Sequence, residues 1–100
     1  ILSHSVQPQW DETEQFYNGF ARVLKGQHFT FINSQFKPIS EPVYDGARNF
    51  SGHLAAVEQN EKWGFINEKG VQIIPCIYDM VFDFTEENTI AYLNKKWLLI

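Results

Sequence analysis

The sequence predicts an all-β protein built from three antiparallel β-meander repeats of 34 residues each. Three observations support this fold class. Aromatic residues recur at a fixed spacing of 34 positions, and the apolar runs between them are only four to six residues long. In addition, 16% of the 100 residues are Phe, Tyr or Trp, which favour strands over helices.

The repeat becomes visible when the sequence is compared with itself at an offset of 34 residues. Three columns are entirely aromatic, and two others keep Asp or Ile in every copy. At 16% aromatic content, chance gives roughly 0.1 all-aromatic columns, so three columns indicate a true repeat. The five columns are Trp10, Tyr44 and Tyr78; Phe16, Phe50 and Phe84; Phe29, Trp63 and Trp97; Asp11, Asp45 and Asp79; and Ile32, Ile66 and Ile100.

The columns divide a single repeat domain, residues 1–100, into four segments. Residues 1–16 are the end of a repeat, 17–50 and 51–84 are whole repeats, and 85–100 are the start of another. In the last segment the run Ile90–Leu93 arrives two residues late, and a shorter turn at Asn94–Lys96 restores the register. Such compensation is typical of a fixed strand ladder with variable turns.

The short apolar runs predict strands rather than the helices of other 34-residue repeats. Helical repeats need apolar residues at i, i+3, i+4 and i+7 over about a dozen residues. Here Gly and Asn turns separate short alternating runs, and Pro38, Pro42 and Pro75 would interrupt helices. We therefore expect a three-stranded meander in each repeat. The clearest strands are Phe20–Lys25, His28–Ile32, Leu54–Val57, Lys62–Ile66 and Val71–Ile74.

A linking segment follows each meander and runs from an aromatic–Asp pair to the next Phe. We expect the Asp to accept backbone N–H groups, as an Asx-turn or a short-helix cap, and the Phe to return to the core. A metal or ligand ring of the three Asp residues is the alternative. Their next neighbours are Glu12, Gly46 and Met80, and these differences favour the structural role.

The two ends of the chain match opposite halves of one repeat, which allows two arrangements. We favour a closed ring of three units, in which the segment from Ile1 to Val6 pairs antiparallel with Lys96–Ile100 and removes two open sheet edges. Alternatively, the chain is an excised fragment of a longer open β-solenoid. The chain starts with Ile rather than Met and lacks a signal-peptide pattern, as expected of an excised piece.

The segment Lys62–Gly70, with Ile73-Ile74-Pro75 and Tyr78-Asp79 after it, resembles a WG (KWG) repeat. The resemblance is strong over residues 50–84 and covers the rest of the chain with lower fidelity. The family's Gly is present in the second copy as Gly64, but Thr30 and Leu98 occupy the same repeat position in the other copies. Because Thr and Leu resist a positive φ, this position does not require one. The resemblance implies a bacterial β-repeat scaffold with no assigned chemistry.

The sequence gives little sign of chemistry, and we expect no enzyme activity, cofactor or metal. It contains no phosphate loop, nucleophile elbow or His-Glu-x-x-His motif. Cys76 is the only cysteine and is expected to be a buried, inert thiol, while His4, His28 and His53 occupy unrelated repeat positions. A net charge of -4 and the lack of a long apolar stretch argue against nucleic acid and membrane insertion.

We therefore expect a non-catalytic module for protein–protein interaction or scaffolding within a larger bacterial protein. Its partner would be another protein or the rest of its own parent chain, in a compartment that the sequence leaves open. The alternative is a glycan- or small-molecule-binding module that uses exposed aromatic residues. The side chains expected to form the repeat core are Trp10, Phe16, Phe29, Tyr44, Phe50, Trp63, Gly64, Tyr78, Phe84 and Trp97.

Overall fold

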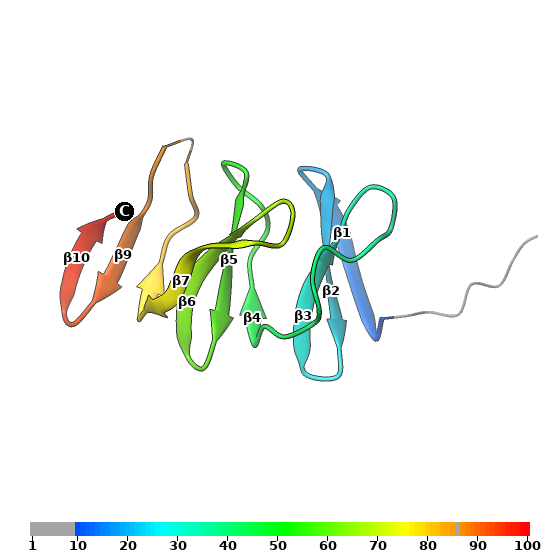
Figure 1. Cartoon of the computed structure of the whole chain (residues 1–100), viewed down its shortest axis with the longest axis horizontal. Helices are drawn as coiled ribbons and strands as arrows, with labels where there is room; N and C mark the ends of the chain where they lie inside the picture. The colour runs from blue at the N-terminus through cyan, green and yellow to red at the C-terminus, as the bar shows by residue number, and fades with distance from the viewer. Residues whose placement is uncertain (1–9, 86) are drawn as a thin grey trace, which may run out of the picture.

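The computed structural model describes residues 10–85 and 87–100, and this part of the chain contains ten strands and no helix. Every strand pairing is antiparallel, and the strands form three sheets that stand in an open row (Figure 1). The prediction of an all-β fold of repeated antiparallel meanders is confirmed.

The three sheets repeat one plan, in which strands that follow one another in sequence also lie next to one another. The middle sheet has one strand more than the other two. The first sheet contains β1 (Glu12–Tyr17), β2 (Phe20–Lys25) and β3 (His28–Ile32); the second β4 (Gly46–Ala47), β5 (Leu54–Gln59), β6 (Lys62–Asn67) and β7 (Gln72–Tyr78); the third β8 (Met80–Val81), β9 (Ile90–Leu93) and β10 (Lys96–Leu99).

The linking segments differ from the expected turns or short helices, because each contains a strand. β1, β4 and β8 each pair with the strand that follows them, β2, β5 and β9. The segments lie against an existing hairpin edge, and extended backbone satisfies its N–H and C=O groups there. The side chains of Asp11, Asp45 and Asp79 take no part in this strand pairing and remain available for other hydrogen bonds.

The third strand of the meander varies between repeats. In the second sheet it is β7, which pairs along β6 from Gln72 to Tyr78. In the first sheet only isolated bridges form, Ile32 with Pro38 and Phe29 with Tyr44. Pro38 and Pro42 remove two N–H groups from this segment, whereas β7 contains a single proline, Pro75.

The core lies between the sheets, where the Phe of the second and third linking segments packs against the preceding sheet. The Phe50 ring stacks on Phe20 with centroids 4.4 Å apart and meets Phe31 edge-on at 4.9 Å. In the next interface Phe84 meets Phe65 edge-on at 5.3 Å. The same column of the repeat therefore joins one sheet to the next in both interfaces.

The described strands favour the open arrangement over the ring. β1 and β10 lie at opposite ends of the row (Figure 1). The expected pairing of the segment from Ile1 to Val6 with Lys96–Ile100 involves residues outside the described part. Within the described residues, the structure also contains no helix long and apolar enough to cross a membrane.

Candidate functional site

The three Asp residues of the repeat make one equivalent hydrogen bond each. Asp11 accepts from the backbone N–H of Gly26 at 2.6 Å, Asp45 from that of Asn60 at 3.0 Å, and Asp79 from that of Asn94 at 3.3 Å. In every case the donor lies fifteen residues further on, in the next hairpin turn. The Asp therefore caps the turn of its own sheet and fixes the register of the hairpin.

Two of the three Asp residues also contact a basic residue of the preceding sheet. Asp79 forms an ion pair with Lys62, and Asp45 lies 3.5 Å from His28, the equivalent residue of the first sheet. The hydrogen bond from Lys62 holds the pKa of Asp79 below its usual value, against an opposing effect of desolvation. A basic residue at the start of the strand and an Asp on the following segment thus recur as a pair.

Gly64, of the Trp-Gly pair, is explained by a close approach of backbone. Its φ is negative, and a Cβ added there would lie 2.3 Å from the carbonyl oxygen of Ile74 and 2.7 Å from the amide nitrogen of Cys76. The register of β6 and β7 shifts at this point, which brings β7 over the glycine. In the first sheet Thr30 fits at the same position, because residues 38–44 make only isolated bridges to β3.

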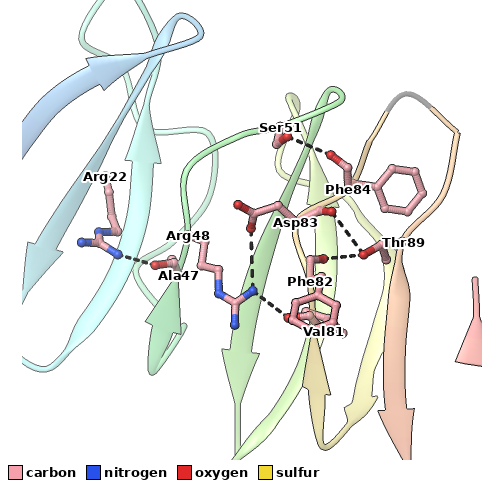
Figure 2. Close-up of polar contacts among 9 residues, drawn as sticks. All are labelled: Arg22, Ala47, Arg48, Ser51, Val81, Phe82, Asp83, Phe84 and Thr89. Atoms are coloured by element: carbon pink, nitrogen blue, oxygen red, sulfur yellow. Dashed lines mark hydrogen bonds and ion pairs between the residues drawn. The ribbon is translucent and has the colours of Figure 1, made fainter. Parts of the chain in front are cut away.

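Each interface between sheets contains one of the chain's two arginines (Figure 2). Arg22 lies over the ring of Phe29 and donates to the carbonyl of Ala47 in the second sheet. Arg48 lies 4.8 Å from the ring of Trp63 and donates to the carbonyl of Val81 in the third sheet at 2.6 Å. The two arginines come from different repeat positions, yet they reach equivalent carbonyls 34 residues apart.

The third sheet has Phe82 where the second has Arg48. The Phe82 ring stacks parallel to Trp97 with centroids 5.7 Å apart, and the Tyr92 ring packs at a tilt against Trp97 with centroids 4.7 Å apart. Thr89 holds the Phe82 segment by donating to its carbonyl oxygen at 2.6 Å (Figure 2). Trp97 is thus covered by the ring of Phe82, whereas Phe29 and Trp63, its equivalents in the other sheets, are covered by an arginine.

The third sheet has an apolar surface on the side that faces away from the second sheet. Val81 and Ala91 point to the second sheet and are fully buried, so their neighbours along the strands point outward. Cross-strand pairing places the outward residues on one face. This face, called here the terminal face, comprises Met80, Phe82, Ile90, Tyr92, Trp97 and Leu99.

Eight of the ten expected core residues are buried or half-buried, and two are exposed. Trp97, at 55% exposure, lies on the terminal face, where the described residues supply no further sheet. Phe16, at 40%, belongs to the column that packs on a preceding sheet, and the first sheet of the described row has none. It meets Phe36 edge-on instead, at 5.7 Å.

The remaining sequence candidates are not brought together as a reactive centre. Burial raises the pKa of the Cys76 thiol, which makes a weak contact of 3.6 Å with the carbonyl of Val57. His28 and His53 lie beside different carboxylates, and His4 is outside the described residues. Residues 10–85 and 87–100 contain no group of three or more potential metal ligands.

Sequence reasoning missed the outward side of the third sheet and the two arginines. Phe82 aligns with Arg48 at the 34-residue offset, so the replacement of an arginine by an aromatic residue at this repeat position could have been found from the sequence. The arginine interaction was not readable, because Arg22 and Arg48 do not share a column. Only the fold shows that both reach the following sheet.

Stacked β-meanders of a 34-residue period, each with an Asp that caps its next hairpin turn, define a β-repeat protein. The model of the family described as WG containing repeat matches residues 5–27, 29–63 and 63–97, and the chain belongs to this family. The resemblance seen at Lys62–Gly70 is thereby confirmed, while the boundaries drawn after residues 16, 50 and 84 stay a prediction. No curated protein and no solved structure matches the chain.

Proposed function

We propose that this chain is a non-catalytic module of a larger bacterial protein and mediates protein–protein interaction or scaffolding. The observation that supports the proposal most is the terminal face, an apolar sheet surface on which Trp97 stacks with Phe82 and packs at a tilt against Tyr92. Five of its six residues are exposed by 43–71%. Contiguous exposed apolar surface on a soluble domain is typical of an interaction site.

The chemistry of the face fits a protein partner. Tyr, Trp, Phe and Met are the residue types enriched at the centres of interfaces, and all four occur here. No charged side chain belongs to the face, so a partner meets no desolvation cost for buried ions. The surface is a sheet rather than a pocket, which suits a macromolecule better than a small ligand.

The proposal is tested with the intact chain as bait for proteins of its source cell, identified by mass spectrometry and then purified. A Phe82→Lys/Leu99→Lys variant places two charges on the terminal face. A matched Val71→Lys/Ile77→Lys variant places them on exposed apolar positions outside it. We expect the first variant to weaken binding of the purified partner at least tenfold and the second less than twofold. Equal loss in both variants, or none, contradicts the proposal.

A second candidate, glycan or small-molecule binding, rests on an open depression of about 640 Å³ beside Trp10. Pro38, Pro42 and Lys25 also line it. The half-buried indole of Trp10 can stack on a sugar ring, and the depression is large enough for a small ligand. Titration with a panel of soluble glycans, followed by tryptophan fluorescence, tests this candidate. The change on binding should be absent in Trp10→Phe, which retains only Trp63 and Trp97. Binding that survives Trp10→Ala would exclude this location.

A further inference from the structure

The turn between β1 and β2 consists of Asn18 and Gly19 alone, because Tyr17 pairs directly with Phe20. Both turn residues have positive φ, 53° for Asn18 and 87° for Gly19, as in a type I′ turn. Among the described residues no group accepts a hydrogen bond from the N–H of Gly19. The backbone nitrogen of Gly19 therefore takes no part in the ladder and directly follows the side chain of an Asn.

An Asn that is followed by Gly can lose its amide without an enzyme, since the Asn side chain is chemically labile. The backbone nitrogen of the Gly attacks Cγ of the Asn, a succinimide ring closes, and the Cγ–Nδ2 bond breaks. The amide group leaves as ammonia, which takes up the proton of the Gly N–H. Water then opens the ring at either carbonyl, which leaves aspartate or isoaspartate. Glycine hinders the attack least because it has no Cβ, and a Cβ built at Gly19 would meet no atom within 4 Å.

Two other hairpin turns have the same backbone but a bulkier second residue. Asn60-Glu61 joins β5 to β6 and Asn94-Lys95 joins β9 to β10, with positive φ at both residues of each turn. A long side chain follows the Asn in both turns, and the N–H of the Asn itself is bound by Asp45 or Asp79. The sequence contains one Asn-Gly pair, so these two turns are internal controls for it.

The side chain of Asn18 also connects the first sheet to the second. Its Nδ2 donates to the carbonyl oxygen of Phe50 at 2.6 Å, across 32 positions of the sequence. Phe50 is 2% exposed and stacks on Phe20 of β2, so this bond accompanies the main apolar contact between the two sheets. Nδ2 is also the atom that leaves as ammonia when the Asn is deamidated.

The product would weaken this contact in two ways. A carboxylate accepts hydrogen bonds but donates none, so it repels the carbonyl of Phe50. An isoaspartate also lengthens the backbone of the turn by one carbon atom, which disturbs the register of β1 on β2. Asn18 lines an open depression of about 430 Å³ together with Ser51, His53 and Glu68, so water can reach the ring there.

We propose that Asn18 is a site of spontaneous deamidation and that the reaction loosens the first sheet from the second. The hydrogen bond to Phe50 slows the reaction in the folded chain, because the attack has to turn an amide group that this bond holds in place. Opening of the contact removes the restraint, and a chain that has reacted stays looser than before. The reaction consumes only water and is independent of any partner of the terminal face.

The site is tested by incubating the full 100-residue chain at mildly alkaline pH and mapping its peptides by mass spectrometry. Asn18 should convert at least about tenfold faster than Asn60 and Asn94, with isoaspartate detected by enzymatic methylation. Glu61→Gly creates a second Asn-Gly pair in a turn of matched geometry. Asn60 should then become reactive while Asn18 keeps its rate. Equal rates at the three Asn residues, or an unreactive Asn60 in Glu61→Gly, overturn the inference.

The protection by Phe50 is tested with a peptide of residues 12–25, which contains the turn but not the second sheet. Asn18 should convert about tenfold faster in this peptide than in the folded chain, and urea should raise the rate in the chain to that in the peptide. Conversion in the folded chain as fast as in the peptide would refute the link between the reaction and the sheet contact.

The loosening is tested with Asn18→Asp, which carries the charge of the product in an unaltered backbone. Its equilibrium constant for unfolding in urea should rise about fivefold, because a partly buried hydrogen bond is lost. Asn33→Asp is the matched control, because its side-chain oxygen accepts from the N–H groups of Gln35 and Lys37 and keeps both bonds as a carboxylate. An equal rise in the two variants would show that deamidation leaves the contact intact and would refute the loosening.

Discussion

The second and third sheets share one ladder plan and one set of columns, but their surroundings differ. Trp63 and Phe65 of β6 lie under Arg48 and against the third sheet, and the edge of β6 is covered by β7. Trp97 and Leu99, their equivalents on β10, are exposed by 55% and 71%. A residue's column thus sets its position in the ladder, whereas its burial depends on whether a sheet follows.

The comparison also shows how an interface between sheets is specified. Both internal interfaces use an arginine that stacks on the strand's aromatic and binds a carbonyl of the next sheet. On the third sheet Phe82 replaces the arginine, so its outward face is wholly apolar. In a repeat array the same ladder can therefore present outward faces of different chemistry.

The largest expected difference lies between Phe65→Ala and Leu99→Ala, two truncations in one column. Phe65 is fully buried between two sheets, so its loss should lower the free energy of unfolding by about 4 kcal/mol. Leu99 is mostly exposed, and its truncation should cost about 0.5 kcal/mol or less. Urea denaturation measures both. Similar values would contradict the contrast between the sheets.

Next in size is the pair Gly64→Ala and Leu98→Ala. The added methyl at Gly64 meets the backbone of β7, so overpacking should lower the free energy of unfolding by about 3 kcal/mol. At Leu98 no described strand passes over the site, and the same residue should cost about 1 kcal/mol or less. Thermal unfolding of both variants decides the matter. A tolerated Gly64→Ala would mean that β7 does not cross β6 as described.

A smaller effect is expected for Arg48→Met, which keeps the length of the side chain and removes its charge. The variant loses the hydrogen bond to Val81 and the cation–π contact with Trp63, at about 1–2 kcal/mol in the free energy of unfolding. Phe82→Leu is the matched change on the third sheet and should be nearly neutral. An equal loss of unfolding free energy in the two variants would contradict the proposed difference between the internal faces and the terminal face.

The smallest effect concerns pH. Because the pKa of Asp79 is lowered in the folded chain, its contribution to stability is present above the unfolded value of about 3.9. This contribution disappears as the pH falls through the lower folded value. Asp79→Asn should therefore narrow the stability difference between pH 7 and pH 3, while Glu87→Gln, in the loop before β9, serves as control. An unchanged pH profile would show that the Lys62 pair contributes nothing.

The sequence was sufficient to predict the fold class, the period and most strands. The prediction succeeded because positions in the strand ladder, such as Trp63 and Tyr78, carry the same type of side chain in every repeat. Hairpins also form between neighbouring segments, so a local sequence pattern can reveal them. The linking segments were missed, because Asp11 and its equivalents carry a signal that turns and caps share with edge strands. Short strands such as β4 and β8 form only because they pair with the edge of an existing hairpin, and the sequence of the short segment alone does not show this pairing.

The candidate site was less predictable. Aromatic columns indicated core, and this holds for Phe50 but not for Trp97, since exposure is decided by the presence of a following sheet. The exchange of Arg48 for Phe82 lies in the sequence, yet its meaning needs the stacking partner Trp97. Contacts between sheets join residues about 30 positions apart, which short-range reading cannot connect.

β6 and β10 are equivalent strands of the ladder, and the protection of their backbone groups depends on what covers them. Residue-resolved hydrogen exchange of the backbone amides tests this claim directly. We predict that the amides of Trp63 and Phe65 exchange at least about a hundredfold more slowly than those of Trp97 and Leu99, while Leu98, bonded to β9, stays protected. Equal protection of Trp63 and Trp97 in the free, monomeric chain would contradict the claim.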